Sequence, residues 1–389
     1  MQYLLLALLL LLSGCNSSST STPTTDSFTQ EEKGFLQRLF TTEYLWADQV
    51  TPLRDTTPYT TPKAMIEALR VSPPDHWSFM VTKAEYEAFA NQKTEGFGIG
   101  MTQEFILYLV RIDAPAYGKL LRGDKLLEIN HQPITAERLT QASQALGEET
   151  TFRLLRAGKE LEVTVTPQAY SFKVSEGKVL TVGTKKVGYL RFDSFTGSAV
   201  AEFESIFTQF HDAGVDELII DLRYNGGGSV TTASLLLDNI TRDYPQKEQF
   251  YMDWNSHYQY NNSRYYFAEQ SEQDGNELAM DRVFFLVTEQ SASASELVIS
   301  SLIPYLGDSH VITIGSDTHG KPVGMSGAVY QDHYYFLINF FVQNSAGNHS
   351  SFDGIAVTCE AQDDLTHLRG DANETMLKTA LSYIETGGC

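Results

Sequence analysis

An alternating Ser-Ala segment between two apolar stretches is the feature that most constrains how this chain folds. The run Val283–Thr288 is short and rich in β-forming residues, which is typical of a buried strand. Ser291–Glu296 follows with the sequence SASASE, and Leu297–Ile303 then has apolar residues at helical spacing. A buried strand, a small-residue turn and a helix can present a nucleophile, because the first N–H groups of a helix are free to hold an oxyanion. A serine-rich helix cap is the alternative interpretation.

Two further motifs flank this segment in the chain. Leu218–Gly228 reads LIIDLRYNGGG, so a second apolar strand ends in glycines that can take positive φ and let another backbone approach. It has neither the Gly-Lys-Ser/Thr ending of a phosphate loop nor the GxGxxG spacing of a dinucleotide site. Thr318–Lys321 reads THGK and follows the apolar run Val311–Ile314, which places Lys321 in a dry setting.

The order of these motifs, DLRxNGGG then SASASE then THGK, resembles that of the C-terminal processing peptidases, also called tail-specific proteases. The resemblance extends across most of the mature chain. It implies a multi-domain α/β protein with an N-terminal helical region, a PDZ β-barrel and a ββα-repeat (crotonase-like) peptidase core. It also implies a Ser-Lys dyad, which falls on Ser293, the central serine of the alternating run, and on Lys321.

A serine hydroxyl needs a base beside it, and a lysine serves as that base only when burial keeps it neutral. The sequence offers two bases, Lys321 and His319. The resemblance favours Lys321, and His319 is interpreted as a loop histidine, with a Ser-His hydrolase as a third hypothesis. The expected oxyanion donors are the N–H groups of Ala294 and Gly227.

Supporting roles are expected elsewhere in the two motifs. Asp221 and Arg223 are predicted to hold the end of their strand together. The chain departs from the family pattern at Met325, where a Gln that orients the lysine is usual, and at Pro322 after the Gly-Lys pair. These departures keep a second hypothesis open, a catalytically inactive peptide-binding lipoprotein of the same fold.

The start of the chain is predicted to be a targeting segment. Residues 1–14 contain an apolar stretch, Leu4–Leu12, that is too short to span a bilayer and is typical of a signal peptide. Leu12-Ser13-Gly14-Cys15 resembles a bacterial lipobox, which implies lipidation of Cys15. Residues 15–27 are mostly Ser, Thr, Pro and Asn and are predicted to be a flexible tether. The expected location is the cell envelope, anchored to the outer membrane or to the periplasmic face of a bacterial membrane.

Three structural regions are predicted after the tether. Residues 28–92 have helical periodicity. Residues 93–169 resemble a PDZ domain, in which Gly98, Ile99, Gly100 and Met101 form the loop that binds a peptide carboxylate. A small β-barrel that only spaces the other regions is the alternative.

Residues 170–389 form the predicted peptidase core. The strand Val187–Phe192, the amphipathic helix Ala199–Phe210 and the strand before Asp221 predict a right-handed crossover unit. The polar, Tyr-rich stretch Thr241–Asp281 is predicted to be a surface excursion, and a closing helix is predicted around Met376–Leu381.

Composition limits the possible partners. The 389 residues carry a net charge of −21 and no basic run, which argues against nucleic acid as a partner. No Cys/His cluster has the spacing of a metal site, so neither a metal nor another cofactor is expected. Cys359 and Cys389 remain after Cys15, and the sequence leaves open whether they pair.

These observations predict a lipid-anchored serine endopeptidase of the cell envelope. Its substrates would be proteins or peptides caught by their C-termini through the PDZ domain.

Overall fold

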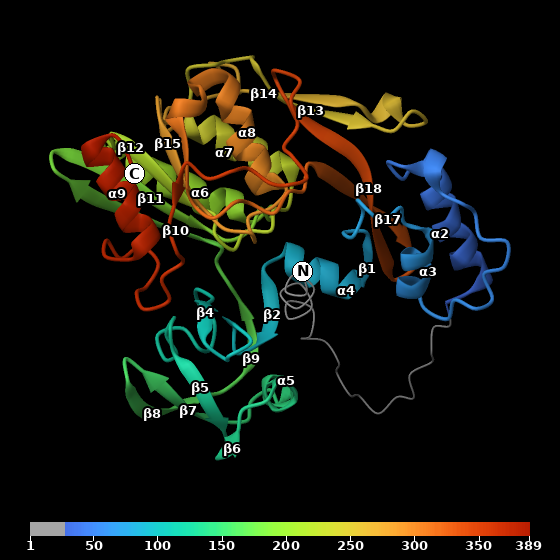
Figure 1. Ribbon diagram of the computed structural model, residues 1–389, viewed down its shortest axis with the longest axis horizontal. Coiled ribbons are helices and arrows are strands. Elements are labelled where there is room, and N and C mark those ends of the chain that lie inside the picture. The colour runs from blue at the N-terminus through green and yellow to red at the C-terminus, as the bar shows by residue number, and fades with distance from the viewer. Residues whose placement is uncertain (1–27) are drawn as a thin grey trace.

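The computed structural model describes residues 28–389, and Figure 1 shows how their elements are arranged. The predicted signal peptide, the lipidation site Cys15 and the tether all lie in residues 1–27, outside the described residues. Among the described residues, none of the helices combines the length and apolar character needed to cross a bilayer.

A six-stranded sheet forms the centre of the larger part of the molecule. Its order is β10-β11-β12-β15-β16-β19, with β10 antiparallel to β11 and all later neighbours parallel. The strands are β10 (Ser175–Val182), β11 (Lys185–Phe192), β12 (Glu217–Asp221), β15 (Val283–Val287), β16 (Val311–Gly315) and β19 (Cys359–Glu360). The carboxyl ends of β12 and β15 therefore meet at one edge of the sheet, where the two serine- and glycine-rich turns begin.

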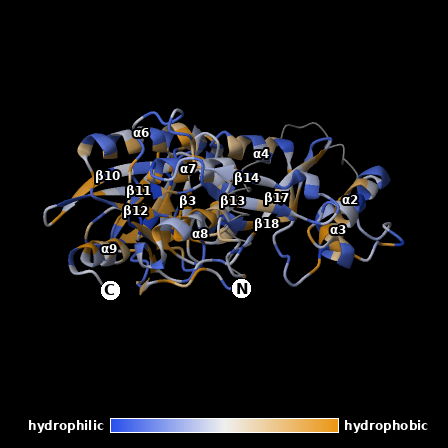
Figure 2. Ribbon diagram, turned by 90° about the horizontal axis from the view of Figure 1, so that it is seen from above, coloured by the Kyte–Doolittle hydropathy of each residue, from blue (hydrophilic) through white to orange (hydrophobic). Residues whose placement is uncertain are grey.

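Helices cover both faces of this sheet. Ile220 and Phe285 point into one apolar core, which the sheet shares with α6 (Ala199–Ala213), α7 (Val230–Ile240) and α8 (Ala294–Leu306). Ile219 and Phe284 point into a second core under α9 (Thr375–Thr386). Figure 2 shows α6 and α9 on opposite sides of β10, β11 and β12. The alternation of inward side chains along each strand produces this three-layer α/β arrangement.

A second, five-stranded sheet lies beside the first. The long strand β18 pairs on one side with β17 and on the other with β1 and β13, and β14 pairs with β13. The strands are β1 (Phe79–Thr82), β13 (Glu248–Trp254), β14 (Ser263–Tyr266), β17 (Val323–Tyr330) and β18 (His333–Asn344). The Tyr-rich stretch predicted as a surface excursion thus contributes two paired strands, because its aromatic residues also pack across strands.

The N-terminal region packs against this second sheet. Its helices are α2 (Gln30–Thr42), α3 (Pro62–Leu69) and α4 (Lys83–Ala90), and short 3₁₀ turns occur at Ala47–Gln49, Gln259–Asn261 and Asp308–His310. Leu36 and Phe40 of α2 share a core with Leu337 of β18. Residues 28–92, which the sequence analysis expects to be helical, contain these three helices and also β1, which joins the sheet built by residues from the other end of the chain.

Residues 93–169 have a core of their own, which includes Phe97, Leu126 and Phe152. Three small sheets surround it: β2 with β9, β3 with β4, and β6-β5-β7-β8. The elements are β2 (Lys93–Gly96), β3 (Ile99–Met101), β4 (Leu107–Val110), β5 (Lys125–Ile129), β6 (Gln132–Pro133), α5 (Ala136–Gln144), β7 (Thr150–Arg156), β8 (Lys159–Val165) and β9 (Gln168–Ser171). The paired strands of residues 93–171 do not close into a barrel, so the PDZ β-barrel expected from the sequence is not seen as such.

A disulfide joins Cys359 and Cys389, which answers the question that the sequence left open. It attaches the segment after α9 to β19, the edge strand of the central sheet. The two cysteines are separated by 30 residues, for which the chain-entropy description gives a stabilisation of about 3.5 kcal/mol.

Candidate active site

The three serines of the alternating run have different environments. Ser291 and Ser295 are fully buried, and their hydroxyls donate to the carbonyl oxygens of Leu222 and Asn225 at 2.8 Å. Ser293, between them, is only partly buried. The outer serines therefore attach the turn to the strand end of β12, and the central hydroxyl is the one left accessible.

The backbone at Ser293 is strained. Ser293 precedes α8 with φ 57° and ψ −113°, a combination that residues with a side chain rarely adopt. Such strain persists only where the surroundings hold it in place, and a strained strand-to-helix turn is how several hydrolases expose a serine nucleophile. The geometry of this turn therefore suits a nucleophile better than an ordinary helix cap.

Gly227 allows the glycine turn to lie directly against Ser293. It has φ +102°, and a Cβ there would lie 2.9 Å from both Ser293 Cβ and the Ala292 carbonyl oxygen, and 3.0 Å from the Ala294 nitrogen. A side chain cannot fit at that distance from a backbone, so the position requires glycine. The close approach of two motifs that are far apart in the sequence, as their order predicted, is observed.

The two expected oxyanion donors differ in their availability. The N–H of Ala294, the first residue of α8, makes no hydrogen bond within residues 28–389, as is usual for the first turn of a helix. The N–H of Gly227 donates to Asn225 Oδ1 at 2.9 Å. In this conformation the N–H of Gly227 is therefore already used and that of Ala294 is free, and the role of both groups as oxyanion donors stays a prediction.

A buried glutamate, which the sequence analysis did not single out, joins the serine turn to the lysine loop. Glu296 is 1% exposed, and its Oε2 accepts hydrogen bonds from the backbone N–H of Ser293 at 2.8 Å and from that of Lys321 at 2.9 Å. Its Oε1 accepts from the Thr318 hydroxyl at 2.6 Å and from the Gly320 N–H at 2.7 Å. One carboxylate thus fixes the backbones of both predicted dyad residues.

We expect Glu296→Gln to lower the free energy of unfolding by about 2–4 kcal/mol, because an amide has one acceptor oxygen and leaves buried donors unpaired. Chemical denaturation would measure the loss. Thr318→Val removes one donor to the same carboxylate and also the hydroxyl that accepts the Ile355 N–H, and should cost about 1–2 kcal/mol. Equal losses in the two variants would show that Glu296 does not hold the two segments together.

Lys321 lies in the loop between β16 and β17 and is partly buried. Burial lowers the pKa of its amine to about 8, against the opposing influence of Asp75 and Glu296, which favour the charged form. Within the described residues its Nζ makes no hydrogen bond or ion pair, and only its main-chain N–H is engaged. A large fraction of this amine is therefore neutral near pH 8 and free to accept a proton.

One ring nitrogen of His319 is already engaged in a hydrogen bond. Its Nε2 lies 3.0 Å from Trp77 Nε1, which can only donate, so this ring nitrogen accepts. Its main-chain N–H donates to the Ser291 carbonyl oxygen at 3.0 Å, and burial lowers the pKa of its ring. The acceptor nitrogen therefore faces Trp77, in agreement with the interpretation of His319 as a loop histidine.

Met325 lies on β17 opposite Ile338 and packs against the core under α2 and α3. Its thioether side chain has no amide that could orient the lysine. The loop that carries Lys321 is held instead by Glu296, which accepts hydrogen bonds from three of its residues: Thr318, Gly320 and Lys321.

The strand end before the glycine turn is held by a fully buried ionic network, as predicted for Asp221 and Arg223. Arg223 Nε donates to Asp221 Oδ1 at 3.0 Å, and its two terminal nitrogens donate to the two oxygens of Glu374 at 2.9 Å each. Although burial alone would raise the pKa of Asp221, Arg223 and Arg369 hold that pKa well below its usual range. This network fixes the strand end from which Asn225 and Gly227 follow.

The predicted carboxylate-binding loop lies in the separate module of residues 93–169. Ile99, Gly100 and Met101 form β3, so only Gly98 remains in the turn before it. A Cβ on Gly98 would lie 2.2 Å from Ala114 Cβ and 2.7 Å from the Tyr170 hydroxyl. The space on that side of Gly98 is therefore filled by protein.

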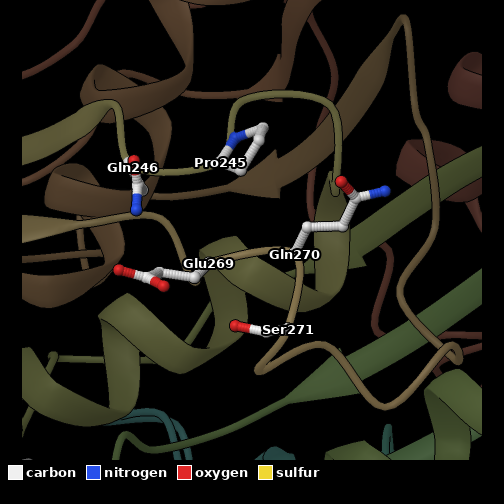
Figure 3. A pocket seen from close by; sticks show the side chains of 5 residues that line it. All are labelled: Pro245, Gln246, Glu269, Gln270 and Ser271. Carbon is white, nitrogen blue, oxygen red and sulfur yellow. The ribbon is translucent and has the colours of Figure 1, made fainter.

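Other features of the described residues contribute nothing to this site. Figure 3 shows an open pocket lined by Pro245, Gln246, Glu269, Gln270 and Ser271, none of which contacts the serine turn or the lysine loop. In the part of the chain that the structure describes, no group of three or more His, Cys, Asp or Glu side chains is placed to hold a metal ion.

A three-layer α/β core presents an accessible serine at a strained strand-to-helix turn, and one glutamate holds the lysine loop to the same turn, which are features that nucleophilic catalysis by a serine requires. Residues 186–357 match the model of peptidase family S41.

Comparisons with known proteins agree. The chain is 23% identical over 300 residues to carboxyl-terminal-processing peptidase 1 of Arabidopsis thaliana, a match that covers 69% of this chain and 55% of the relative. It is 23% identical over 289 residues to a protein of Staphylococcus aureus described as a CtpA-like serine protease, covering 69% and 53%. The chain thus spans about half the length of these relatives.

A solved structure from Bacteroides fragilis, described as an S41 protease, superposes with a TM-score of 0.78. It is 22% identical, and the match covers 91% of this chain and 97% of that one. At this identity the match establishes the shared fold.

Proposed function

We propose that this chain is a serine endopeptidase of the C-terminal processing type, with Ser293 as nucleophile and Lys321 as general base. The observation that carries the proposal is the environment of Ser293. It is the one accessible serine of three, held at a strained turn, and Glu296 binds its backbone and that of Lys321 through a single oxygen.

In the proposed reaction the neutral Lys321 amine takes the proton from Ser293 Oγ as this oxygen attacks the scissile carbonyl carbon. The carbonyl oxygen becomes an oxyanion, which the Ala294 N–H is free to bind. The Lys321 ammonium then gives its proton to the leaving amine. Water, deprotonated by the same lysine, hydrolyses the acyl-enzyme and restores Ser293.

The proposal extends to how substrate is caught. We infer that residues 93–169 act as a PDZ domain that binds the C-terminal end of a protein or peptide. Apart from its pairing with β4, the backbone of β3 makes no strand pairing within the described residues, so an extended peptide could add there as a further strand. Lipidation at Cys15 would place the enzyme in the cell envelope, and the ββα-repeat description of the core belongs to the same proposal.

The inactive peptide-binding alternative is less well supported. Met325 motivated it, because it replaces a residue that usually orients the lysine. The lysine loop is nevertheless held by Glu296, and the relatives that match are peptidases.

A serine-reactive phosphonate probe provides the test. We expect it to label Ser293 in the wild-type protein, identified by mass spectrometry of the modified peptide, and the same protein to cleave unfolded casein. His319→Ala should retain both properties, because its acceptor nitrogen is occupied by Trp77. A label on another residue, or loss of labelling in His319→Ala, would reject the proposed dyad.

A further inference from the structure

A second buried carboxylate, Asp75, lies near the lysine loop. Asp75 comes from the segment between α3 and β1 and has no exposed surface. Four neutral donors surround it: the Tyr44 hydroxyl at 2.8 Å, the backbone N–H of Trp77 at 2.8 Å, and the backbone N–H and the hydroxyl of Ser78 at 3.0 and 2.6 Å. Within residues 28–389 it makes no ion pair, so its charge is solvated by dipoles but balanced by no cation in contact.

The segment that carries Asp75 is joined to the lysine loop. Two residues after Asp75, Trp77 donates its indole N–H to His319, which is two residues before Lys321, so the two segments are joined side by side. Asp75 exerts the largest opposing influence against the burial that lowers the pKa of Lys321. The other groups that face this lysine are Glu296 and His319, and His76 faces the histidine ring at 6.0 Å between centroids.

Glu296 is less suited to balance the charge on the lysine amine. Each of its two oxygens already accepts two hydrogen bonds, and one of these four bonds comes from the Lys321 backbone N–H. Asp75 approaches from a different segment, in the N-terminal region. A lysine that takes a proton in a dry site becomes a buried ammonium, which is costly unless a negative charge is close.

We propose that Asp75 is the counter-charge of Lys321, a positioning residue that stabilises the ammonium formed when the base accepts the serine proton. The inference rests on the proposed function, in which Lys321 is that base. Asp75 itself takes no proton: the proton moves from Ser293 Oγ to Lys321 Nζ and then to the leaving amine. At position 325 the family usually has a Gln that orients the lysine, and here Met325 offers no polar group. Asp75 would stabilise the charged lysine in its place.

The test measures Lys321 directly, so it is independent of turnover. In a Ser293→Ala background, the pH dependence of Nζ acetylation by acetic anhydride, followed by mass spectrometry, reports the midpoint at which the amine becomes neutral. Asp75→Asn keeps the shape of the side chain but removes its charge, and should move this midpoint down by about one pH unit or more. Ser78→Ala removes one hydrogen bond to the same carboxylate and keeps the charge, so its midpoint should stay in place.

In the otherwise wild-type enzyme the same change should appear in the activity profile. The base works when neutral, so kcat/KM is lost as pH falls through about 8. In Asp75→Asn this acidic limb should move to lower pH, while kcat on the plateau falls by about tenfold or more, with KM unchanged. An unchanged midpoint in Asp75→Asn, or an equal shift in Ser78→Ala, overturns the inference while leaving the proposed function intact.

A double-mutant cycle covers the case in which Asp75→Asn folds poorly. At pH 6, where Lys321 is charged, Asp75→Asn should cost less stability in a Lys321→Met background than in wild type. Equal costs in the two backgrounds would mean that the carboxylate only holds its own turn. Failure of the phosphonate probe to label Ser293 rejects the enzyme itself, which is a separate result.

Discussion

Lys321→Met is expected to slow cleavage of a peptide substrate by about 10⁴-fold or more, and Ser293→Ala by a similar factor. Methionine keeps the apolar stem of lysine and removes only the amine, so the fold of the loop held by Glu296 should survive. Without the amine, the proposed base that takes the proton from Ser293 is missing. Steady-state rates at pH 9, where most of the wild-type amine is neutral, would measure the loss.

The double variant provides a sharper check. Residues that act as one catalytic unit are not additive, so Ser293→Ala combined with Lys321→Met should be about as slow as either variant alone. Lys378→Met, on α9, removes an exposed lysine whose amine makes no hydrogen bond or ion pair within the described residues, and it serves as the control. Activity within about tenfold of wild type in Lys321→Met would contradict a lysine base.

Glu374→Ala should destabilise the core by about 3–5 kcal/mol, the largest loss of stability that we expect from one substitution. Glu374 has no exposed surface and accepts both terminal nitrogens of Arg223 at 2.9 Å. It also caps α9, accepting the N–H of Leu377 at 3.0 Å. Removing it leaves part of a buried guanidinium unpaired and a helix without its cap.

Urea denaturation followed by circular dichroism would measure this effect. Glu385→Ala, at an exposed position on the same helix, removes a carboxylate of equal charge and should change stability by less than about 0.5 kcal/mol. Similar midpoints for Glu374→Ala and wild type would show that the strand end does not depend on this pair. A loss of activity without a loss of stability is likewise not expected, because Glu374 acts through Arg223.

The sequence predicted the elements that local pattern determines. Apolar runs of six and four residues became β15 and β16, and the amphipathic spacing after Phe195 became α6. The order of the motifs also indicated that the glycine turn meets Ser293, because both follow neighbouring parallel strands. These features depend on periodicity and on small residues, which are visible in any single sequence.

What could not be predicted depends on contacts between distant segments. The role of Glu296 requires knowing that the loop at Lys321 folds back onto the first turn of α8. The N–H of Gly227 donates to the side chain of Asn225. No sequence motif reveals that this side chain would compete with a substrate for the N–H. Asp75 reaches the site from the N-terminal region, and its separation from Lys321 in the sequence hides the connection entirely.

The backbone angles at Ser293 have a consequence for variation at that position. Glycine would adopt φ 57° and ψ −113° with less strain than any residue that carries a Cβ. Backbone stability therefore favours glycine at position 293, whereas the proposed chemistry requires serine. Replacing Ser293 with glycine would therefore relieve the backbone strain and stabilise the fold, but it would remove the hydroxyl that attacks the substrate.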